Sequence, residues 1–507
     1  MPTRTRTRSS DLTTPHDLPP ARGPLSRPYR WLSIGMFSLI FIAAFEAMAV
    51  TTIMPIVARD LGGESLYALA FAVPLAAGIV GMVIAGNWTD RSGPLPSLLT
   101  SAALFVVGLV IAGTATDMGV FIVGRFVHGL SGAAVIVPLY VIVARAYPEA
   151  LRARVFAGFA AAWVIPSIVG PALAGAAVEA VTWHWVFLGV IALVLPAAAM
   201  MLPPLLRVRH LVHGDRSVRW SPGRMAWAAL AAVAALGVSL AAELDGPWPW
   251  PVAIAAIAVV AFASRPLMPR GTLRSARGMP ATVLQKLIVA GAFFGSEIYL
   301  PYLLMERYGF SPGLAGAVLT GAGVAWAAAS WLQGRLGEAR VSNTRAVVIA
   351  SASLAVALVV VFLVALLGLA PWIAFVAWTL AGGAMGFMYP RFNVEVLSLS
   401  ARAEQGFNSA ALTIAESLGA TVALAITALV ASTIGGGSFA PEFAVTLAIA
   451  AVAVLLAPRV RPPGAAARSD ASGGTDASGG ADAASEPASR QPAGAPATVS
   501  ERPVAGE

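Results

Sequence analysis

Two charged residues, Glu46 and Arg125, stand inside stretches that are otherwise almost purely apolar, at residues 40–50 and 120–130. A charge near the centre of a bilayer costs roughly 3 kcal/mol or more, so it usually faces a partner or a path for an ion or substrate. Counting about 1.5 Å per helical residue places Glu46 about 13 Å and Arg125 about 12 Å from the same membrane side. We therefore expect these two side chains to meet, directly or through water.

A carboxyl group beside an arginine in a cavity that opens alternately to each side can act as a proton switch. Our hypothesis is that Glu46 binds a proton in one facing state and releases it in the other. The alternative is a static buried pair that only stabilises the bundle. Such pairs rarely add net stability over apolar packing, which favours the functional interpretation.

Three further residues are candidates for the same chemistry. Glu297 lies in the segment 293–299, at the position in the second half that corresponds to Glu46, and Glu416 lies near the middle of a span that starts at about residue 405. Either carboxylate could bind a proton or a cationic drug. His128 follows Arg125 by three residues and so lies on a nearby helix face, where it either tunes the site or packs as an ordinary core histidine.

The composition places these residues in a membrane protein. The chain has 507 residues, of which 58% are hydrophobic and only 11% charged, whereas soluble domains carry about a quarter charged residues. There is no cysteine, which excludes disulfides and thiol chemistry, and the five histidines show no metal-ligand spacing. We find no phosphate loop and no nucleophile–base arrangement, so we predict no cofactor, no metal, no nucleic-acid partner and no enzymatic activity.

Long apolar runs predict about fourteen membrane-spanning helices in an all-α fold. The expected spans are 31–54, 66–87, 95–114, 118–145, 154–179, 184–204, 225–244, 249–264, 281–304, 312–333, 345–368, 372–399, 405–433 and 440–458. They divide the chain into two six-helix bundles, 31–204 and 281–458, with an inserted helix pair at 225–264. Basic loops at 205–224 and 265–280 flank this pair, and polar tails at 1–30 and 459–507 are predicted to be disordered.

The arginines indicate the orientation. With the N-terminus in the cytoplasm, nearly every loop arginine falls on the inner side, and only Arg59 and Arg307 fall on the outer side. Positive charge in short loops sets topology in this way, which also accounts for the net charge of +8. We therefore predict a multi-pass protein of the plasma membrane, the inner membrane of a bacterial cell, with both termini in the cytoplasm.

Two glycine-containing segments could control movement. The turn at 86–93 contains Gly86, Asp90, Arg91 and Gly93, where the charged pair could latch neighbouring helix ends or simply form a charged turn. The segment 170–175 contains Gly170, Pro171 and Gly175. Proline removes a helix hydrogen bond and small residues allow close helix contact, so this segment is either a hinge and seal or plain close packing.

These segments resemble three motifs of the major facilitator superfamily, in the same order along the chain. The turn resembles the loop motif of this family, Gly124–Ala134 resembles its fourth-helix motif through Arg125 and Gly129, and the segment 165–175 resembles its fifth-helix antiporter motif. The resemblance covers about residues 31–458. It implies a major facilitator fold, and the two extra helices resemble the fourteen-helix drug:proton antiporter branch.

The resemblance implies a secondary active transporter, and its fifth-helix motif favours export. We expect proton-coupled efflux of hydrophobic or cationic drugs by alternating access, as in antibiotic resistance, by a chain that works as a monomer. Proton-coupled uptake or export of a specific metabolite is the alternative. A membrane-embedded enzyme or lipid-handling protein would need a polar cluster at the membrane surface, which we do not find. Aromatic residues inside the spans could line the substrate cavity: Trp163, Phe294, Tyr299 and Tyr389.

Overall fold

Helices make up nearly all of the structure, a computed structural model that describes residues 23–27, 29–208, 212, 214–242, 244–400, 404–434 and 438–461. The tails predicted to be disordered lie for the most part outside the described residues. So do residues 209–211 and 213 of the first basic loop.

The N-terminal half contains six long helices, each of which matches a predicted span. They are α1 (Arg30–Asp60), α2 (Tyr67–Ser92), α3 (Pro94–Gly113), α4 (Met118–Ala146), α5 (Glu149–Ala180) and α6 (His184–Val208). The inserted pair is α7 (Pro222–Ala241) and α8 (Pro249–Ser264). Short 3-10 turns lie at Glu64–Leu66, Arg265–Leu267, Thr272–Arg274 and Ala457–Val460.

The C-terminal half repeats this order, except that its first span is broken at Ile298. Its helices are α9 (Met279–Glu297), α10 (Tyr299–Tyr308), α11 (Pro312–Arg340), α12 (Asn343–Leu367), α13 (Pro371–Leu399), α14 (Gln405–Ile434) and α15 (Ala440–Leu456). The described residues contain 14 spans long and apolar enough to cross a membrane, with α9 and α10 counted as one. The predicted all-α fold with about fourteen spans is confirmed.

Local sequence signals account for several helix ends. The Asp117 side chain accepts a hydrogen bond from the Val120 amide at 3.0 Å and caps α4. Gly309 and Gly368 follow α10 and α12 with φ of 66°, the left-handed conformation that ends helices most easily at glycine. The break at Ile298 lies three residues before Pro301, whose missing N–H interrupts the hydrogen-bond ladder.

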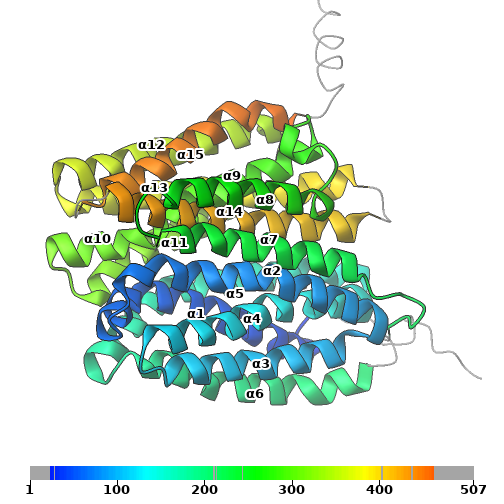
Figure 1. Cartoon of the computed structure of the whole chain (residues 1–507). Coiled ribbons are helices and arrows are strands. Elements are labelled where there is room, and N and C mark those ends of the chain that lie inside the picture. The colour runs from blue at the N-terminus through cyan, green and yellow to red at the C-terminus, as the bar shows by residue number, and fades with distance from the viewer. Residues whose placement is uncertain are drawn as a thin grey trace, which may run out of the picture. The chain divides into compact units, whose positions relative to one another are not determined.

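The two halves use the same helix packing. In the N-terminal half α2 and α3 pack on α4, α1 packs on α5 and α6, and α3 packs on α6. In the C-terminal half the corresponding pairs recur: α11 and α12 pack on α13, α9 packs on α14 and α15, and α12 packs on α15. Figure 1 shows α1–α6 in its lower part and most of α9–α15 above them.

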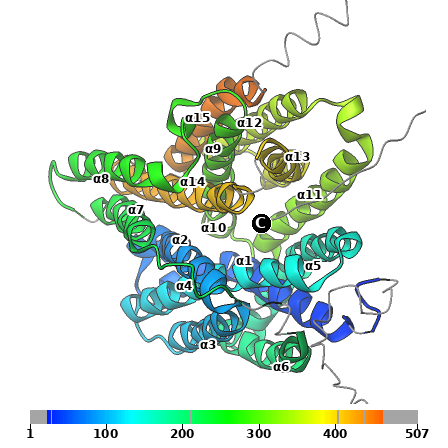
Figure 2. The ribbon, with the colours of Figure 1, turned by 90° about the vertical axis from the view of Figure 1, so that its right-hand side faces the viewer.

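Two equivalent helix pairs join the halves, α5 with α11 and α2 with α14. The inserted helix α7 packs on both α2 and α14, and α8 packs on α7. Figure 2 shows this pair at the left edge of the bundle, beside α2 and α14. The pair therefore covers one of the two places where the halves meet.

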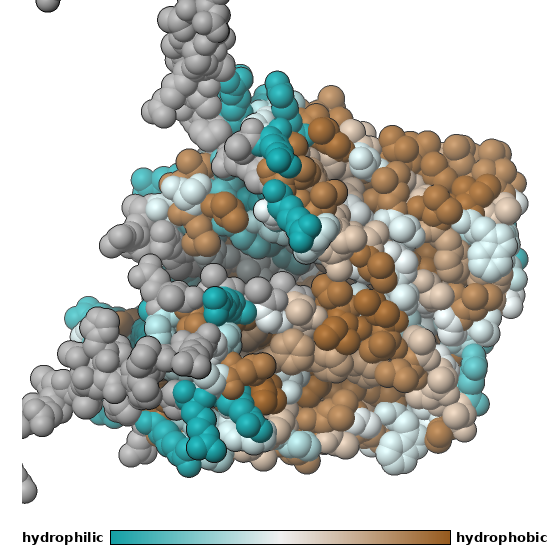
Figure 3. Space-filling model, turned by 180° about the vertical axis from the view of Figure 1, so that it is seen from behind, coloured by the Kyte–Doolittle hydropathy of each residue, from teal (hydrophilic) through white to brown (hydrophobic). Residues whose placement is uncertain are grey.

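The two ends of the bundle differ in polarity. Residues 214–221 before α7, which we call the linker, lie at one end of the bundle, together with the last residues of α2, α4 and α11. We call this the linker end, and the opposite end the far end. Figure 3 shows hydrophilic residues gathered at one end of the molecule and hydrophobic residues over much of the remaining surface. Exposed apolar side chains such as Val376 and Leu455 suit contact with lipid.

Candidate functional site

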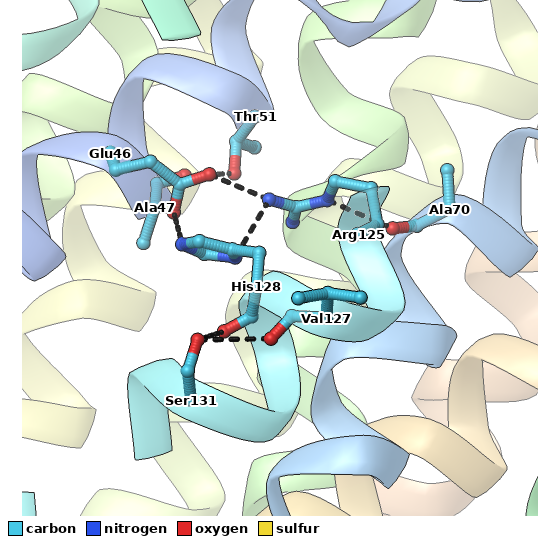
Figure 4. A network of polar contacts seen from close by, with 8 residues as sticks. All are labelled: Glu46, Ala47, Thr51, Ala70, Arg125, Val127, His128 and Ser131. Carbon is cyan, nitrogen blue, oxygen red and sulfur yellow. Dashed lines mark hydrogen bonds and ion pairs between the residues drawn. The ribbon is translucent and has the colours of Figure 1, made fainter. Parts of the chain in front are cut away.

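The predicted pair of Glu46 and Arg125 is in direct contact. The Arg125 Nη1 donates to the Glu46 Oε1 at 2.6 Å, between α1 and α4 (Figure 4). The Glu46 side chain is only 3% exposed and the Arg125 side chain only 7%. A short charge-assisted contact of this kind compensates part of the cost of burying both charges.

His128 completes a cluster of three residues, which we call the N-half cluster. Its Nε2 lies 3.4 Å from the Glu46 Oε2, and its Nδ1 lies 3.4 Å from the Arg125 Nη1. The ring of Phe105 on α3 lies 4.5 Å from the histidine ring, centre to centre. The helical spacing of three residues places His128 beside Arg125 on α4, so both can reach the same carboxylate.

Close packing of α2 and α4 supplies one more partner to the arginine. The Arg125 Nε donates to the carbonyl oxygen of Ala70 on α2 at 3.3 Å. One turn further along α4, a side chain at Gly129 would lie 2.1 Å from the Pro74 Cα, so only glycine permits this approach. The glycine of the fourth-helix motif thus holds α2 close enough for its backbone to contact Arg125.

A second charged pair lies in the C-terminal half, between α9 and α14. The Lys286 Nζ lies 2.9 Å from the Glu416 Oε2 and 5.1 Å from the ring centre of Tyr389 on α13. The lysine side chain is 5% exposed, whereas the glutamate side chain is 30% exposed. This pair is therefore more open than the N-half cluster, and we call it the C-half pair.

Two other buried carboxylates of the C-terminal half stand alone. Glu297, at the end of α9, is buried and forms no hydrogen bond or ion pair with the residues that the structure describes. Glu442, in the first turn of α15, is also buried, and its Oε2 has no hydrogen-bond partner there. Isolated buried carboxyl groups are costly unless they can take up a proton.

The segment 170–175 lies where the N-terminal half meets α11 of the C-terminal half. A side chain at Gly175 would lie 2.6 Å from the Gly313 Cα, and one at Gly316 would lie 2.9 Å from the Pro171 Cβ. Gly170 instead faces α1, with 3.3 Å from its added Cβ to the Met48 Cβ. Small residues therefore form a tight seam between the halves toward the far end.

Polar contacts join the halves at the same end. The Tyr67 hydroxyl donates to the Ile298 carbonyl oxygen at 2.7 Å, at the break between α9 and α10. Arg59, after α1 has crossed the bundle, forms an ion pair with Glu306 on α10. Polar contacts at the far end thus add to a hydrophobic core that runs through both halves.

The segment 86–93, predicted as a turn, is the last part of α2, which runs to Ser92, followed by Gly93, and this segment binds the linker. The Arg91 Nη1 donates to the carbonyl oxygens of Arg216 and Val218, at 3.3 and 2.8 Å. Asp90 interacts electrostatically with Arg145 and Arg224, at the ends of α4 and α7. Arg91 therefore binds the backbone of the linker, and Asp90 interacts electrostatically with both neighbouring helix ends.

Glycine conformation shapes the connection from α2 to α3. Gly93 has a φ of 84° between α2 and α3, which a side chain would strain. Gly86 faces open space, with only the Val137 side chain at 3.9 Å from an added Cβ. Nearby in the linker, hydrogen bonds from Ser217 hold the pKa of the exposed Asp215 below its usual range.

The aromatic candidates occupy different surroundings. Trp163 on α5 is exposed, while Phe294 and Tyr299 belong to the packed core. Tyr389 is buried between Lys286 and Trp326, whose ring centre lies 5.0 Å away. Only Tyr389 among these four touches a charged residue of either site.

The sequence argument did not single out Lys286 or Glu442. Lys286 is the only lysine of the chain and stands in an apolar span, which is a signal as strong as that of Glu46. Glu442 follows a proline at the start of a span, where an acidic residue usually indicates a helix start only. The described residues contain no cluster of three or more potential metal ligands.

Two repeated halves of six spans each, an inserted helix pair and one buried charge pair within each half define a polytopic membrane protein over the described residues. Residues 36–424 match the family model for the Major Facilitator Superfamily, and the chain belongs to this superfamily. It is therefore a membrane transporter with a small-molecule substrate.

Relatives among characterised proteins include drug exporters. The chain is 25% identical over 404 residues to the multidrug efflux pump SdrM of Staphylococcus aureus (strain N315), covering 77% of this chain and 88% of that protein. It is 24% identical over 307 residues to multidrug resistance protein 3 of Bacillus subtilis (strain 168), covering 57% and 58%. A probable multidrug-efflux transporter of Mycobacterium tuberculosis is 27% identical over 220 residues, which covers 43% and 46%.

Solved structures share the fold. A POT family transporter in complex with 5-aminolevulinic acid has a TM-score of 0.64 at 13% identity, covering 83% of this chain and 94% of that chain. A D-xylose-proton symporter has a TM-score of 0.61 at 14% identity, covering 85% and 97%. At such identities the likeness concerns the fold alone.

Proposed function

We propose that this protein is a proton-coupled exporter of hydrophobic and cationic small molecules that works by alternating access. The observation that carries the proposal is the buried contact of 2.6 Å between Glu46 and Arg125. A carboxylate within a membrane span is expensive to bury and usually serves an ion or substrate path. Here Glu46 would exchange its arginine partner for a proton once in each transport cycle.

The contacts of Glu46 suit this role. Arg125 stabilises the ionised carboxylate, and the backbone carbonyl of Ala70 helps to hold the guanidinium when the carboxylate is neutral. His128 contacts both members of the pair and can accept or release a proton itself. A proton on Glu46 would therefore weaken one strong contact without leaving the arginine free of partners.

The seam between the halves supports alternating access. Its contacts include glycine-mediated and apolar helix packing, hydroxyl hydrogen bonds from Tyr67 to Ile298 and from Thr320 to Ile168, and one exposed ion pair. Exposed ion pairs contribute about 1 kcal/mol or less, so this ion pair opposes opening of the far end only weakly. We propose that the seam opens when the linker end closes and closes again after release of the substrate.

The orientation follows from the arginines. Apart from Arg59 and Arg307, the arginines of the described loops lie at the linker end. We propose that this end faces the cytoplasm, that both termini lie there, and that the membrane is the plasma membrane. The far end would then open to the outside, which suits export.

The substrate class rests on the relatives and on charge. Two curated relatives are named for multidrug efflux or multidrug resistance. Inside the bundle, Glu46 and Glu416 are paired with Arg125 and Lys286, which leaves Glu297 and Glu442 as uncompensated acids. An acidic excess of this kind favours cationic drugs, and export of such drugs would confer antibiotic resistance.

Inverted membrane vesicles with an acidic interior test this proposal. We expect wild-type protein to accumulate ethidium in such vesicles, and Glu46→Gln to abolish accumulation while binding and folding remain. Asp245→Asn, in the exposed α7–α8 loop, is the matched control and should transport normally. Wild-type transport by Glu46→Gln would refute the role of Glu46. Accumulation driven only by an alkaline interior would instead indicate proton symport.

A further inference from the structure

Lys286 is unusual in the composition of this chain. Of the 33 lysine and arginine residues it is the only lysine, and it lies inside a membrane span, almost fully buried. Arginine binds carboxylates through a rigid fork, whereas lysine is a compact point charge on a flexible four-carbon stem. The single lysine of the chain therefore places here a cation that can move away from its carboxylate partner.

The surroundings of the ammonium group are those of an organic-cation site. The Lys286 Nζ lies 2.9 Å from the Glu416 carboxylate and 5.1 Å from the centre of the Tyr389 ring. A carboxylate beside an aromatic face is the combination that binds protonated amines and quaternary cations. The lysine thus occupies the place that the charged group of such a ligand would take.

This place is accessible from the side of the carboxylate. Glu416 is 30% exposed, and Tyr140, which comes from α4 in the other half, is 48% exposed. Tyr140 interacts electrostatically with Glu416, but no hydrogen bond joins them. The hydroxyl of the buried Tyr389 has no hydrogen-bond partner among the described residues. The partly exposed Glu416 carboxylate therefore interacts with one tyrosine from each half.

We propose that Lys286 is an internal competitor for the substrate. Aromatic organic cations would bind between Glu416, Tyr389 and Tyr140, and each would have to displace the Lys286 ammonium from the carboxylate. The proposal deepens the proposed function, on whose cationic substrate class it rests. The displaced ammonium remains tethered and returns when the ligand leaves, so the carboxylate is never left without a cation.

Specificity follows from this competition. A neutral apolar molecule gains nothing from Glu416 and does not need to move Lys286. A cation gains the carboxylate only by replacing an ammonium that is already there, so weakly binding cations are rejected. Lys286 would therefore set the affinity threshold for cations without affecting neutral compounds.

The test measures equilibrium binding of radiolabelled tetraphenylphosphonium to the purified full-length protein at pH 8. We expect Lys286→Met to bind this cation about tenfold more tightly than the wild type, because its competitor is gone. Glu416→Gln should lose most of the binding, and Lys286→Arg should bind no more tightly than the wild type. Equal affinity of the wild type and Lys286→Met, or binding by neither, would overturn the proposal.

Two controls separate competition from a structural effect. Gln285→Met removes a polar side chain from the adjacent position of α9, where Gln285 donates to the Ser351 hydroxyl and the Ala453 carbonyl, and should leave cation affinity unchanged. Binding of the neutral dye Nile red should be the same in Lys286→Met and the wild type. An equal gain for both probes would indicate a loosened bundle and would also overturn the proposal.

The binding assay contains no membrane and no gradient, so its outcome does not depend on proton coupling. If Glu46→Gln transported normally while Lys286→Met gained affinity for the cation, the coupling role of Glu46 would fail and the internal competitor would stand. If vesicle transport behaved as proposed while cation affinity stayed constant, only the internal competitor would fail.

Discussion

In the N-terminal half, Glu46, Arg125 and His128 are shut between α1 and α4, with side chains at most 8% exposed. In the C-terminal half, the Glu416 carboxylate remains 30% exposed beside Lys286, between α9 and α14. The helix packing of the two halves is the same, but the charged residues occupy different helix pairs. A repeated fold therefore fixes where helices run without fixing where the chemistry lies.

The matching position shows how far the halves have diverged. Arg125 lies seven residues after the start of α4, and Trp378 lies seven residues after the start of α13. Trp378 stacks on Phe293 of α9 with ring centres 4.7 Å apart. The place of an ion pair in one half is thus filled by an aromatic stack in the other.

The largest expected effect concerns the stability of the sealed cluster. Arg125→Met leaves the Glu46 carboxylate buried without its partner, and we expect a loss of about 3 kcal/mol in unfolding free energy. Thermal unfolding in detergent measures this. The double variant Arg125→Met/Glu46→Gln should recover most of the loss, and Arg59→Met, in an exposed pair, should cost about 1 kcal/mol or less. A loss of unfolding free energy for Arg125→Met as small as that for Arg59→Met would contradict this prediction.

A larger side chain in the seam should make the N-half cluster more accessible to solvent. Valine at Gly175 would press on Gly313, and overpacking of this kind costs about 1–3 kcal/mol. We expect Gly175→Val to reduce ethidium transport about tenfold, since 1.4 kcal/mol corresponds to that factor. It should also raise carbodiimide labelling of Glu46. Gly158→Val is the matched control on the same helix, because an added Cβ there meets nothing within 4 Å.

Chemical labelling of the unmodified protein tests the difference in exposure directly. A water-soluble carbodiimide with an amine nucleophile should modify Glu416 several-fold faster than Glu46, as quantified by mass spectrometry of peptides. The exposed Asp245 should react faster than either. Equal rates at Glu46 and Glu416 would show that the two sites are equally accessible.

The smallest expected effect concerns the stability of the C-half pair. Lys286→Met leaves a carboxylate that can still reach solvent, so we expect the unfolding free energy to fall by less than about 1 kcal/mol. Thermal unfolding of Lys286→Met and Arg125→Met under the same conditions gives the comparison. A loss as large as that of Arg125→Met would mean that Lys286 serves mainly to hold α9 against α14.

Sequence reasoning reached the spans because the bilayer requires about 20 apolar residues for each helix. It also reached the contact of Glu46 with Arg125, since depth along a helix follows from counting residues. It could not give the pairing of Lys286 with Glu416, because that depends on which helices are neighbours and how each is rotated.

The hydrogen-bond partners of Arg91 could not be predicted from the sequence for a different reason. They are backbone carbonyls of an irregular linker, whose path leaves no periodic pattern in the sequence. The helix break at Ile298 is easier to predict from the sequence, because Pro301 removes a helix hydrogen bond wherever it stands. Local backbone chemistry could thus be predicted, whereas contacts between distant irregular segments could not.

The inserted helix α7 contacts α2 and α14, and so touches both halves at once. Any rotation of one half against the other must therefore make at least one of these two surfaces slide. The buried side chains of α7 are mostly alanines, including Ala228, Ala231 and Ala235, which present few protrusions that could interlock. An alanine-rich helix surface would let the halves shift while it covers the interface between them from lipid. Its packing would hold the halves together less strongly than leucine-rich packing does.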